Sequence, residues 1–479
     1  MPTSAEIRER LPHPVIDVDG HYIELVPVLA EQIRDVADAR VAERLCRVID
    51  LDPARAGGGT ALDDAGRAIR WGARMPWWGA PRSARDRVTA HVPAVLRGRL
   101  DELGIDVSIL YPSLGLMMMG VAEAELRQAG CRALNRYQAD LLAGLGDRLL
   151  APAAIPIHTP EEAIAELDYC VGTLGYRTCV VTGSVRRVRP ELREAQAVPA
   201  PRNARFDWLG VDSEYDYDPF WRRCVELGVS VTCHGGSMGT DLRESPSRYM
   251  FNHIGHFAAN AEAFAKALYM GGVTRRFPAL RFGFLEGGVG WGVQLLAALA
   301  DRWSKRGGPN IAALDPDRLD WREVEAGLRA VDPRFAAPDV MASLRAYAGV
   351  ASRELDDFAA AGIGTLADVP ARFVDAFFFG CEADDPINLW AFDRTRNPFG
   401  VKLRAMLGSD VGHWDVVDMA EVVEEAHESV ERGLLGEDDF RDFVCDNAIR
   451  LHAHGNPDFF AGTIVESYAK ERVSKGSGA

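Results

Sequence analysis

The sequence predicts an α/β fold, a (β/α)₈ TIM barrel with long helical insertions. Two observations lead to this prediction. Short, almost continuous apolar runs alternate along the chain with amphipathic helical stretches, which is the pattern of parallel strands buried between helices. Eight such runs can be found, and eight is the number of strands in this barrel. An open doubly wound sheet is the rival fold. It is disfavoured because no glycine-rich dinucleotide motif follows the first strand.

The elements can be placed in order along the chain. The predicted strands cover residues 14–18, 106–112, 150–157, 177–183, 229–234, 280–286, 374–380 and 405–410. The helix after the third strand has a clear start, because Thr159 is a suitable N-cap and Pro160 suits the first helical position. Residues 1–470 are expected to form a single metal-dependent barrel domain, followed by a disordered tail over 471–479. Insertions are expected at about 30–100, 190–216 and 305–370.

Composition excludes several classes of partner. The chain has 479 residues and a net charge of −16, which argues against binding to nucleic acid or to an anionic membrane surface. No apolar run approaches the ~18 residues of a membrane span. The eight cysteines are scattered without CxxC spacing, which is typical of reduced thiols in a cytoplasmic protein. The long insertions favour a homodimer.

Ionisable residues stand at the ends of four predicted strands. In a TIM barrel the functional groups lie at the C-terminal ends of the strands. Burying an unpaired ionisable group there is costly, so a converging set indicates a shared ligand. Each residue alone is more often a hydrogen-bonded rim residue than a ligand. Together they predict a metal site whose ligands are Asp19, His21, Glu24, His234, Glu286 and Asp410.

Further residues near these strand ends are candidates for catalysis. Asp410 is expected to take the proton of an attacking water, and His413, with Asp415, to orient it. His256 follows His253 at a spacing that places both on one face of a helix. His256 is expected to stabilise an oxyanion or to donate a proton. The alternative is that His256 is a buried, hydrogen-bonded helix residue.

The order of these segments resembles the amidohydrolase superfamily, in its amidohydrolase-2 branch with the aminocarboxymuconate-semialdehyde and dihydroxybenzoate decarboxylases. The resemblance covers most of the chain, including Tyr111-Pro112-Ser113, FLEGGVGW and MLGSDVGHWD. It implies that His234 and Asp410 bind metal. The chain departs from the family at Asp19-Gly20-His21, where His-x-His is usual, and at Glu286, where histidine is frequent. A carboxylate-rich set suits iron or manganese better than zinc, and one or two divalent ions are expected, with iron the most suspected.

The expected function is a metal-dependent hydrolase that uses a metal-activated water on an ester-like carbonyl. The resemblance further implies a non-heme di-iron thioesterase, cleaving a bulky hydrophobic coenzyme A thioester in bacterial terpenoid biosynthesis. The alternative is a metal-dependent non-oxidative decarboxylase. Glu286 counts against it, because such enzymes tend to keep an imidazole at this position for proton delivery. A rival from another class is a non-catalytic, metal-free barrel.

The substrate pocket is expected to be apolar. Its candidate residues are Trp77, Trp78, Tyr111 and Met118, which suit a bulky hydrophobic acyl group. Packing within the insertion explains the two tryptophans equally well. Several arginines, among them Arg186, Arg187 and Arg205, are candidates to hold a coenzyme A tail, although exposure to solvent accounts for them equally well.

Overall fold

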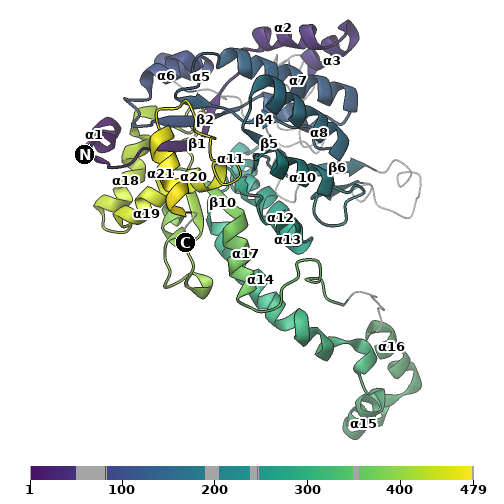
Figure 1. Cartoon of the computed structure of the whole chain (residues 1–479). Coiled ribbons are helices and arrows are strands. Elements are labelled where there is room, and N and C mark those ends of the chain that lie inside the picture. Colours follow the sequence, from purple (N-terminus) through teal and green to yellow (C-terminus); the bar gives the residue numbers. More distant parts are fainter. Residues whose placement is uncertain are drawn as a thin grey trace.

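The computed structural model contains a closed parallel barrel (Figure 1). It describes residues 2–49, 81, 83–188, 204–237, 245, 247–348 and 355–476. One parallel sheet runs β1 (Ile16–Tyr22), β2 (Val107–Pro112), β3 (Leu149–Leu150). The other runs β4 (Ala153–Ala154), β5 (Thr178–Val181), β8 (Ser230–Cys233), β9 (Phe282–Phe284), β10 (Phe377–Cys381), β11 (Arg404–Leu407). Backbone hydrogen bonds from Asp410 N to Asp19 O (2.9 Å) and from His21 N to Val411 O (2.8 Å) join β11 to β1.

The predicted (β/α)₈ barrel is therefore confirmed, and each predicted strand overlaps a strand of the structure. The third predicted strand is divided into β3 and β4. Pro152 lies between them, and a proline has no N–H to donate to a sheet ladder. β3 pairs with β2 and β4 pairs with β5, so the divided strand still links the two sheets.

Helices surround the barrel between its strands. The main ones are α7 (Ala124–Leu141), α8 (Pro160–Tyr169), α10 (Asp218–Glu226), α12 (His256–Met270), α14 (Gly290–Arg306), α17 (Asp368–Ala376), α18 (Val422–Glu431) and α20 (Asn447–His452). α8 begins as predicted, because Thr159 and Glu162 form a reciprocal capping box and Pro160 occupies the first turn. Near β9 and β10 the interior is aromatic, with Phe282, Phe284 and Phe377 completely buried.

The three predicted insertions differ in form. The first contains α2 (Val26–Val36), α3 (Ala39–Ile49), α5 (Ala84–His91) and α6 (Pro93–Arg99), while residues 50–80 and 82 lie outside the described part. In the second, β7 (Ala204–Asp207) pairs antiparallel with β6 (Val185–Val188). The third contains α15 (Trp321–Val331) and α16 (Pro338–Ala348), which project from the barrel beyond α14 (Figure 1).

The C-terminal prediction needs correction. Residues 471–476 were expected to be disordered, but α21 (Glu466–Gly476) runs through them. Arg472 pairs with the buried carboxylate of Asp446, and its Nε lies 2.9 Å from Asp446 Oδ1. Lys475 forms an ion pair with Glu471 one turn earlier. These contacts hold a segment whose composition alone suggested a frayed end.

Two predictions about composition can be compared with the structure. All eight cysteines are unpaired, and seven of them are buried. Among the described residues, no helix is both long enough and apolar enough to cross a bilayer.

Candidate metal centre

The first strand is fixed at the barrel mouth by Asp17. Its Oδ1 accepts hydrogen bonds from Asp19 N (3.1 Å) and Ser409 N (2.8 Å), and its Oδ2 accepts one from Ser108 Oγ (2.5 Å). The pairing register between β1 and β2 shifts between Asp17 and Gly20. A Cβ at Gly20 would collide with Ser108 Oγ and Asp17 Oδ2, so a side chain cannot fit there. Asp17 thus links β1, β2 and the segment after β11.

Five predicted side chains converge where these strands end. His21 Nε2 lies 3.4 Å from both Asp19 Oδ1 and Asp410 Oδ1. His234 Nε2 lies 3.2 Å from His21 Nε2, 3.3 Å from Glu286 Oε2 and 3.7 Å from Asp19 Oδ1. All five side chains are at most 5% exposed. Ligands held about 2.1 Å from one tetrahedral ion lie about 3.4 Å apart, which is close to these separations.

The electrostatics of the cluster suit a bound cation. Asp19 Oδ1, Glu286 Oε2 and Asp410 Oδ1 are buried and have no hydrogen-bond partner among the described residues. Burial raises the pKa of all three carboxyl groups well above the ordinary value, and the neighbouring carboxylates contribute to the rise at Asp19 and Asp410. Burial also lowers the pKa of His21 and His234, which favours the neutral imidazole that binds metals. The donor set therefore fits a divalent ion.

Backbone strain coincides with two of these residues. Glu286 and Asp410 have φ angles of +54° and +49°, in the left-handed region that non-glycine residues rarely adopt. Such a conformation costs on the order of 1 kcal/mol and persists where the surrounding structure enforces it. Glu286 lies two residues after β9, and Asp410 lies three residues after β11. The strained turns direct their carboxylates into the cluster.

His413 extends the cluster toward β2. Its Nδ1 lies 2.6 Å from Asp410 Oδ1, and its ring stacks on His21 with a centroid distance of 3.9 Å. Ser113 Oγ donates to Tyr22 O (2.9 Å), so at 3.0 Å it accepts a hydrogen bond from His413 Nε2. His413 Nδ1 and Asp410 Oδ1 are then both acceptors, and no hydrogen bond joins them in the structure. His413 therefore lies against Asp410, and its role in orienting that carboxylate stays a prediction.

Comparison with known proteins identifies the family. The model of a family described as Amidohydrolase matches residues 16–324, which is more than half of the chain. The chain belongs to the amidohydrolase family. Its enzymes depend on divalent metals, which agrees with the cluster described above.

Solved structures resemble this amidohydrolase in fold. An amidohydrolase from Mycobacterium avium subsp. paratuberculosis K-10 matches with a TM-score of 0.54 and 16% identity, over 92% of this chain and 98% of that one. A 2,6-dihydroxybenzoate decarboxylase from Rhizobium has a TM-score of 0.48 and 15% identity, with the same coverage. A dihydroxybenzoic acid decarboxylase from Polaromonas sp. JS666, with manganese and 2-nitroresorcinol bound, matches with a TM-score of 0.46 and 17% identity, over 94% of this chain and 99% of that one. The first of these supports the barrel fold.

Glu24 is separated from the cluster of this amidohydrolase, so its predicted role as a ligand is corrected. Both of its oxygens accept backbone hydrogen bonds, from Gly115 N (2.7 Å) and Leu114 N (2.9 Å). Glu24 therefore fixes the loop after β2. Glu24 is only three residues from His21 in the sequence, which suggested that it would join the cluster, but β1 ends at Tyr22 and the Glu24 carboxylate binds the loop after β2.

The predicted substrate residues also need correction. Tyr111 is completely buried, and its hydroxyl donates to Thr232 Oγ1 (3.0 Å), so it supports the barrel interior beneath the histidines. Met118 is completely buried in the core and is packed close to Gly130. Trp77 and Trp78 lie outside the described residues.

His256 lies beside the cluster and is not one of its converging groups. It begins α12, and its ring rests on Phe257, with a centroid distance of 3.9 Å. A Cβ at Gly236, in the loop after β8, would collide with its Nδ1. A glycine is therefore required where the loop passes this ring. The catalytic role of His256 stays a prediction.

Glu382 was missed by the sequence reasoning. It directly follows β10, the seventh barrel strand, so the rule that found the other strand ends applies to it as well. Burial at the mouth and the carboxylates of Glu286 and Asp415 raise its pKa to about 8, although solvent reaches part of the residue. The seventh strand was predicted to end at residue 380, which placed Glu382 outside it.

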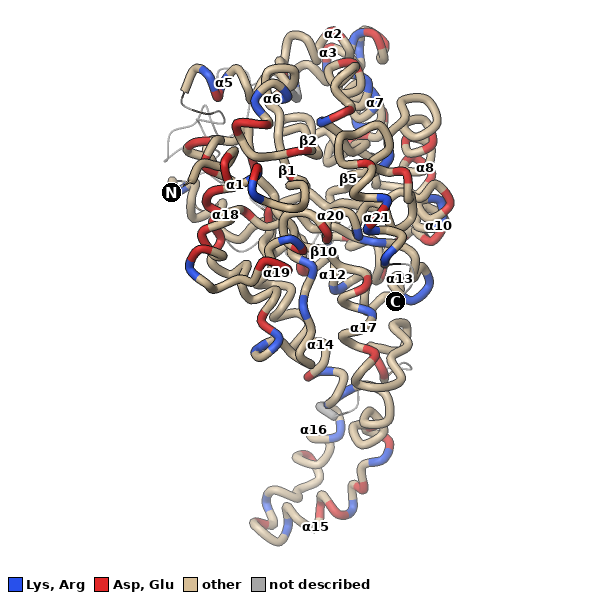
Figure 2. Tube along the Cα trace, turned by 60° about the vertical axis from the view of Figure 1, so that its left-hand side comes forward, with Lys and Arg blue, Asp and Glu red and all other residues tan. Residues whose placement is uncertain are grey.

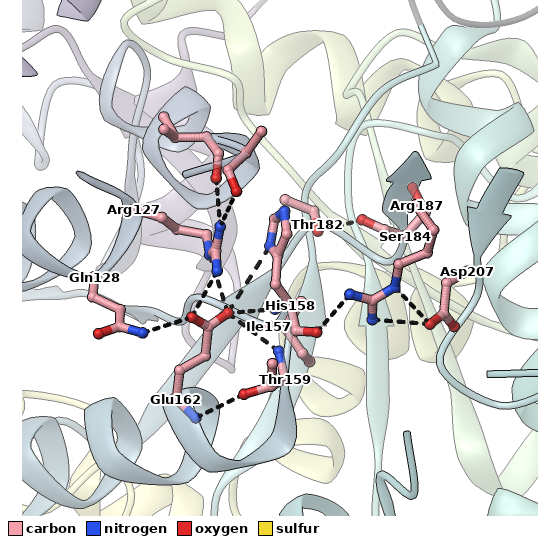
Figure 3. A network of polar contacts seen from close by, with 12 residues as sticks. Arg127, Gln128, Ile157, His158, Thr159, Glu162, Thr182, Ser184, Arg187 and Asp207 are labelled. Atoms are coloured by element: carbon pink, nitrogen blue, oxygen red, sulfur yellow. Dashed lines mark hydrogen bonds and ion pairs between the residues drawn. The ribbon is translucent and has the colours of Figure 1, made fainter. Parts of the chain in front are cut away.

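The candidate coenzyme A arginines receive no support. Arg187 binds Asp207 with Nε (3.0 Å) and Nη2 (2.9 Å), and its Nη1 donates to His158 O (2.7 Å), as Figure 3 shows. It therefore attaches the β6–β7 hairpin to the barrel. Arg205 lies 3.9 Å from Glu214. Arg186 is exposed and has no described ion pair.

Proposed function

We propose that this amidohydrolase is a metal-dependent hydrolase that acts on the neutral carbonyl of an ester, thioester or amide. The observation that carries the proposal is the convergence of five buried side chains whose inward oxygens have no other partner. Asp19, His21, His234, Glu286 and Asp410 would hold the ion. When bound, a divalent ion lowers the pKa of water toward neutrality and polarises a carbonyl.

Asp410 is the proposed proton acceptor. Its Oδ1 faces the cluster, and its backbone is fixed to β1 through Asp19 O. His413, whose Nδ1 lies 2.6 Å from Asp410 Oδ1, packs against the carboxylate and keeps it in one orientation. Ser113 holds the imidazole from its other nitrogen.

The charge of the mouth favours a neutral substrate group. The carboxylates of Asp19, Glu286, Asp410 and Asp415 lie in or beside the cluster, with Glu382 at its edge. Among the described residues, none of the first three, nor Glu382, forms an ion pair with a lysine or arginine. No lysine or arginine of the cluster is therefore placed to pair with a substrate carboxylate, whereas a neutral ester-type carbonyl needs no such partner.

Non-oxidative decarboxylation is the second candidate. Replacing a carboxyl group by hydrogen requires a proton at the site, and Asp410, which faces the cluster and whose pKa is raised by burial, is placed to carry it. Two of the similar structures are named as decarboxylases of dihydroxybenzoates. A bound ion could offset the negative mouth and anchor the substrate carboxylate.

The two reactions are separated by their products. The metal content of purified protein would be quantified, and the loaded protein offered ester, thioester and amide panels beside hydroxybenzoates. We expect acid release with ¹⁸O from labelled water and no CO₂. CO₂ release from a hydroxybenzoate without any hydrolysis would replace the first candidate by the second.

A matched pair of variants tests the assignment of Asp410. Asp410→Asn should lower turnover by about 10²–10⁴-fold, the range of one general base. Glu24→Gln changes a carboxylate of the same region that lies outside the cluster, and it should stay within a few-fold of the parent. Wild-type turnover in Asp410→Asn would contradict the proposal.

A further inference from the structure

A second cleft lies at the opposite end of the barrel. It has a volume of about 280 Å³ and lies between α13 (Val273–Arg276), α17 and the segment that leads into β9. Arg281 directly precedes β9 and Ala376 directly precedes β10, so the cleft is at the N-terminal ends of the strands. The metal centre is at their C-terminal ends. Figure 2 shows charged segments along α13 and α17 in this part of the molecule.

The cleft is lined by three arginines without carboxylate partners. Among the described residues, no ion pair involves Arg275, Arg281 or Arg372, although the chain carries a net charge of −16.

The two acids that line the cleft are engaged elsewhere. Asp368 accepts backbone hydrogen bonds from Gly364 (3.0 Å) and Thr365 (2.7 Å). Asp375 pairs with Arg404 Nη2 at 3.2 Å, and its side chain is 64% exposed. Both acids attract nearby lining arginines, Asp368 acting on Arg372 and Asp375 on Arg281, but neither forms an ion pair with them, so three guanidinium groups face two carboxylates in the lining.

Two lining residues carry buried donors without a partner. Thr274 is 4% exposed, and its Oγ1 makes no described hydrogen bond. The Nε of Arg281 is likewise buried and unpaired, while its Nη1 donates to Pro278 O and Leu280 O. Burial lowers the pKa of Arg281, and burial, with repulsion from Arg281, lowers that of Arg404 to about 10. Unsatisfied buried donors are rare in proteins and call for an explanation.

We propose that this cleft binds a phosphate group, either as inorganic phosphate or as the phosphoryl group of a small metabolite. Guanidinium groups match the geometry of phosphate oxygens and bind them in pairs, and a threonine hydroxyl adds a donor. The volume admits a phosphate with a short organic substituent. This site is independent of the hydrolase proposal, because it shares no residue with the metal centre.

The test measures phosphate binding to the metal-loaded, full-length protein. Inorganic phosphate and glycerol 3-phosphate would be titrated separately at constant ionic strength, with chloride as the reference. Hydrogen exchange would locate the bound anion. We expect saturable binding with protection of residues 273–281 and 368–376. Tighter binding of the ester indicates a metabolite, and tighter binding of inorganic phosphate indicates the free ion.

A neighbouring arginine on α13 provides the control. Arg275→Gln combined with Arg372→Gln should weaken phosphate binding at least about tenfold. Arg276→Gln lies on the same helix, but Arg276 pairs with Asp218 and does not line the cleft, so binding should change less than twofold. The proposal is overturned if wild-type protein shows no saturable binding, if protection is confined to the metal centre, or if Arg276→Gln weakens binding equally.

Discussion

At the scale of single residues, the site depends on groups that hold other groups in place. Asp17 and Ser113 do not face the converging oxygens, yet they fix Asp19 and His413. The residue types at the strand ends could be predicted, because an ionisable group closing an apolar run is rarely without a partner. The supporting residues, Asp17 and Ser113, could not be predicted. Nothing in the sequence distinguishes an aspartate or serine that positions a ligand from one that only packs in the core.

Ser113→Ala should separate catalysis from metal binding. The change removes the acceptor for His413 Nε2 and frees the ring to rotate. We expect turnover to fall about 10–100-fold, the usual effect of losing a supporting contact. The metal content should stay unchanged when measured by elemental analysis. Ser184→Ala, which removes a hydroxyl bonded to Asn260, is the control. Equal turnover in the two variants would remove Ser113 from the mechanism.

His158 should contribute to acid sensitivity. Burial, and the nearby Arg127 cation, lower its pKa to about 4 from an ordinary value of 6.5 (Figure 3). Between these pH values only the unfolded chain takes up the proton, so stability is present above pH 6.5 and is lost as the pH falls toward 4. The loss approaches about 3 kcal/mol. Denaturant titrations at several pH values should show that the free energy of unfolding falls less between pH 6.5 and pH 4 in His158→Gln than in the parent. Above pH 8 the difference between the two proteins should no longer depend on pH. An equal fall in both proteins below pH 6.5 would contradict the prediction.

At the scale of elements, the strands were predictable and their exact ends were not. Eight apolar runs were enough to place the barrel, because strands buried on both faces of a parallel sheet are predominantly apolar along their length. Glu382 was missed because β10 reaches one residue further than predicted, to Cys381. The helical end of the chain was missed for another reason. α21 is held by a tertiary ion pair with Asp446, which local composition does not record.

The closure of the barrel through Asp17 can be tested by Asp17→Ala. The variant leaves Ser108 Oγ and the N–H groups of Asp19 and Ser409 without their acceptor in a buried setting. We expect a loss of about 3 kcal/mol or more in the free energy of unfolding, measured by chemical denaturation. Ser108→Ala removes only one of these bonds and should cost about 1 kcal/mol. Similar losses in both would show that the carboxylate has no linking role.

The attachment of α21 predicts a difference between two of its cations. Arg472→Gln withdraws a partner from the buried Asp446 carboxylate and should lower the free energy of unfolding by about 2 kcal/mol, with Arg441 compensating in part. Lys475→Gln removes an exposed pair and should cost less than about 0.5 kcal/mol. Thermal unfolding of the two variants checks this, and equal midpoints would argue against the attachment.

At the scale of the whole molecule, the structure combines a closed barrel with a projecting arm and a negatively charged mouth. The family and barrel follow from the sequence, because the segments around β1, β8, β9 and β11 keep their order. The substrate does not follow, since the residues expected to line its pocket are either buried in the core or outside the described part. The predicted homodimer and cytoplasmic location stay predictions.

Metal loading should stabilise the entire protein. The unpartnered carboxylates disfavour the folded state without a cation, so binding adds its free energy to folding. At a thousandfold excess over Kd the gain is about 4 kcal/mol. Thermal melts of chelator-treated protein should therefore rise in midpoint as manganese, iron or zinc is returned. Magnesium at equal concentration controls for ionic strength. A midpoint indifferent to all of these metals would contradict the metal centre.

The bond between Asp17 and Ser409 spans 392 positions of the chain. During synthesis on the ribosome, the first strand can pair with β2 early, but its other edge gains its partner, β11, only when the last strand has left the exit tunnel. A truncated nascent chain that ends before β11 also lacks Asp410. The ligand set is therefore complete only when the barrel closes.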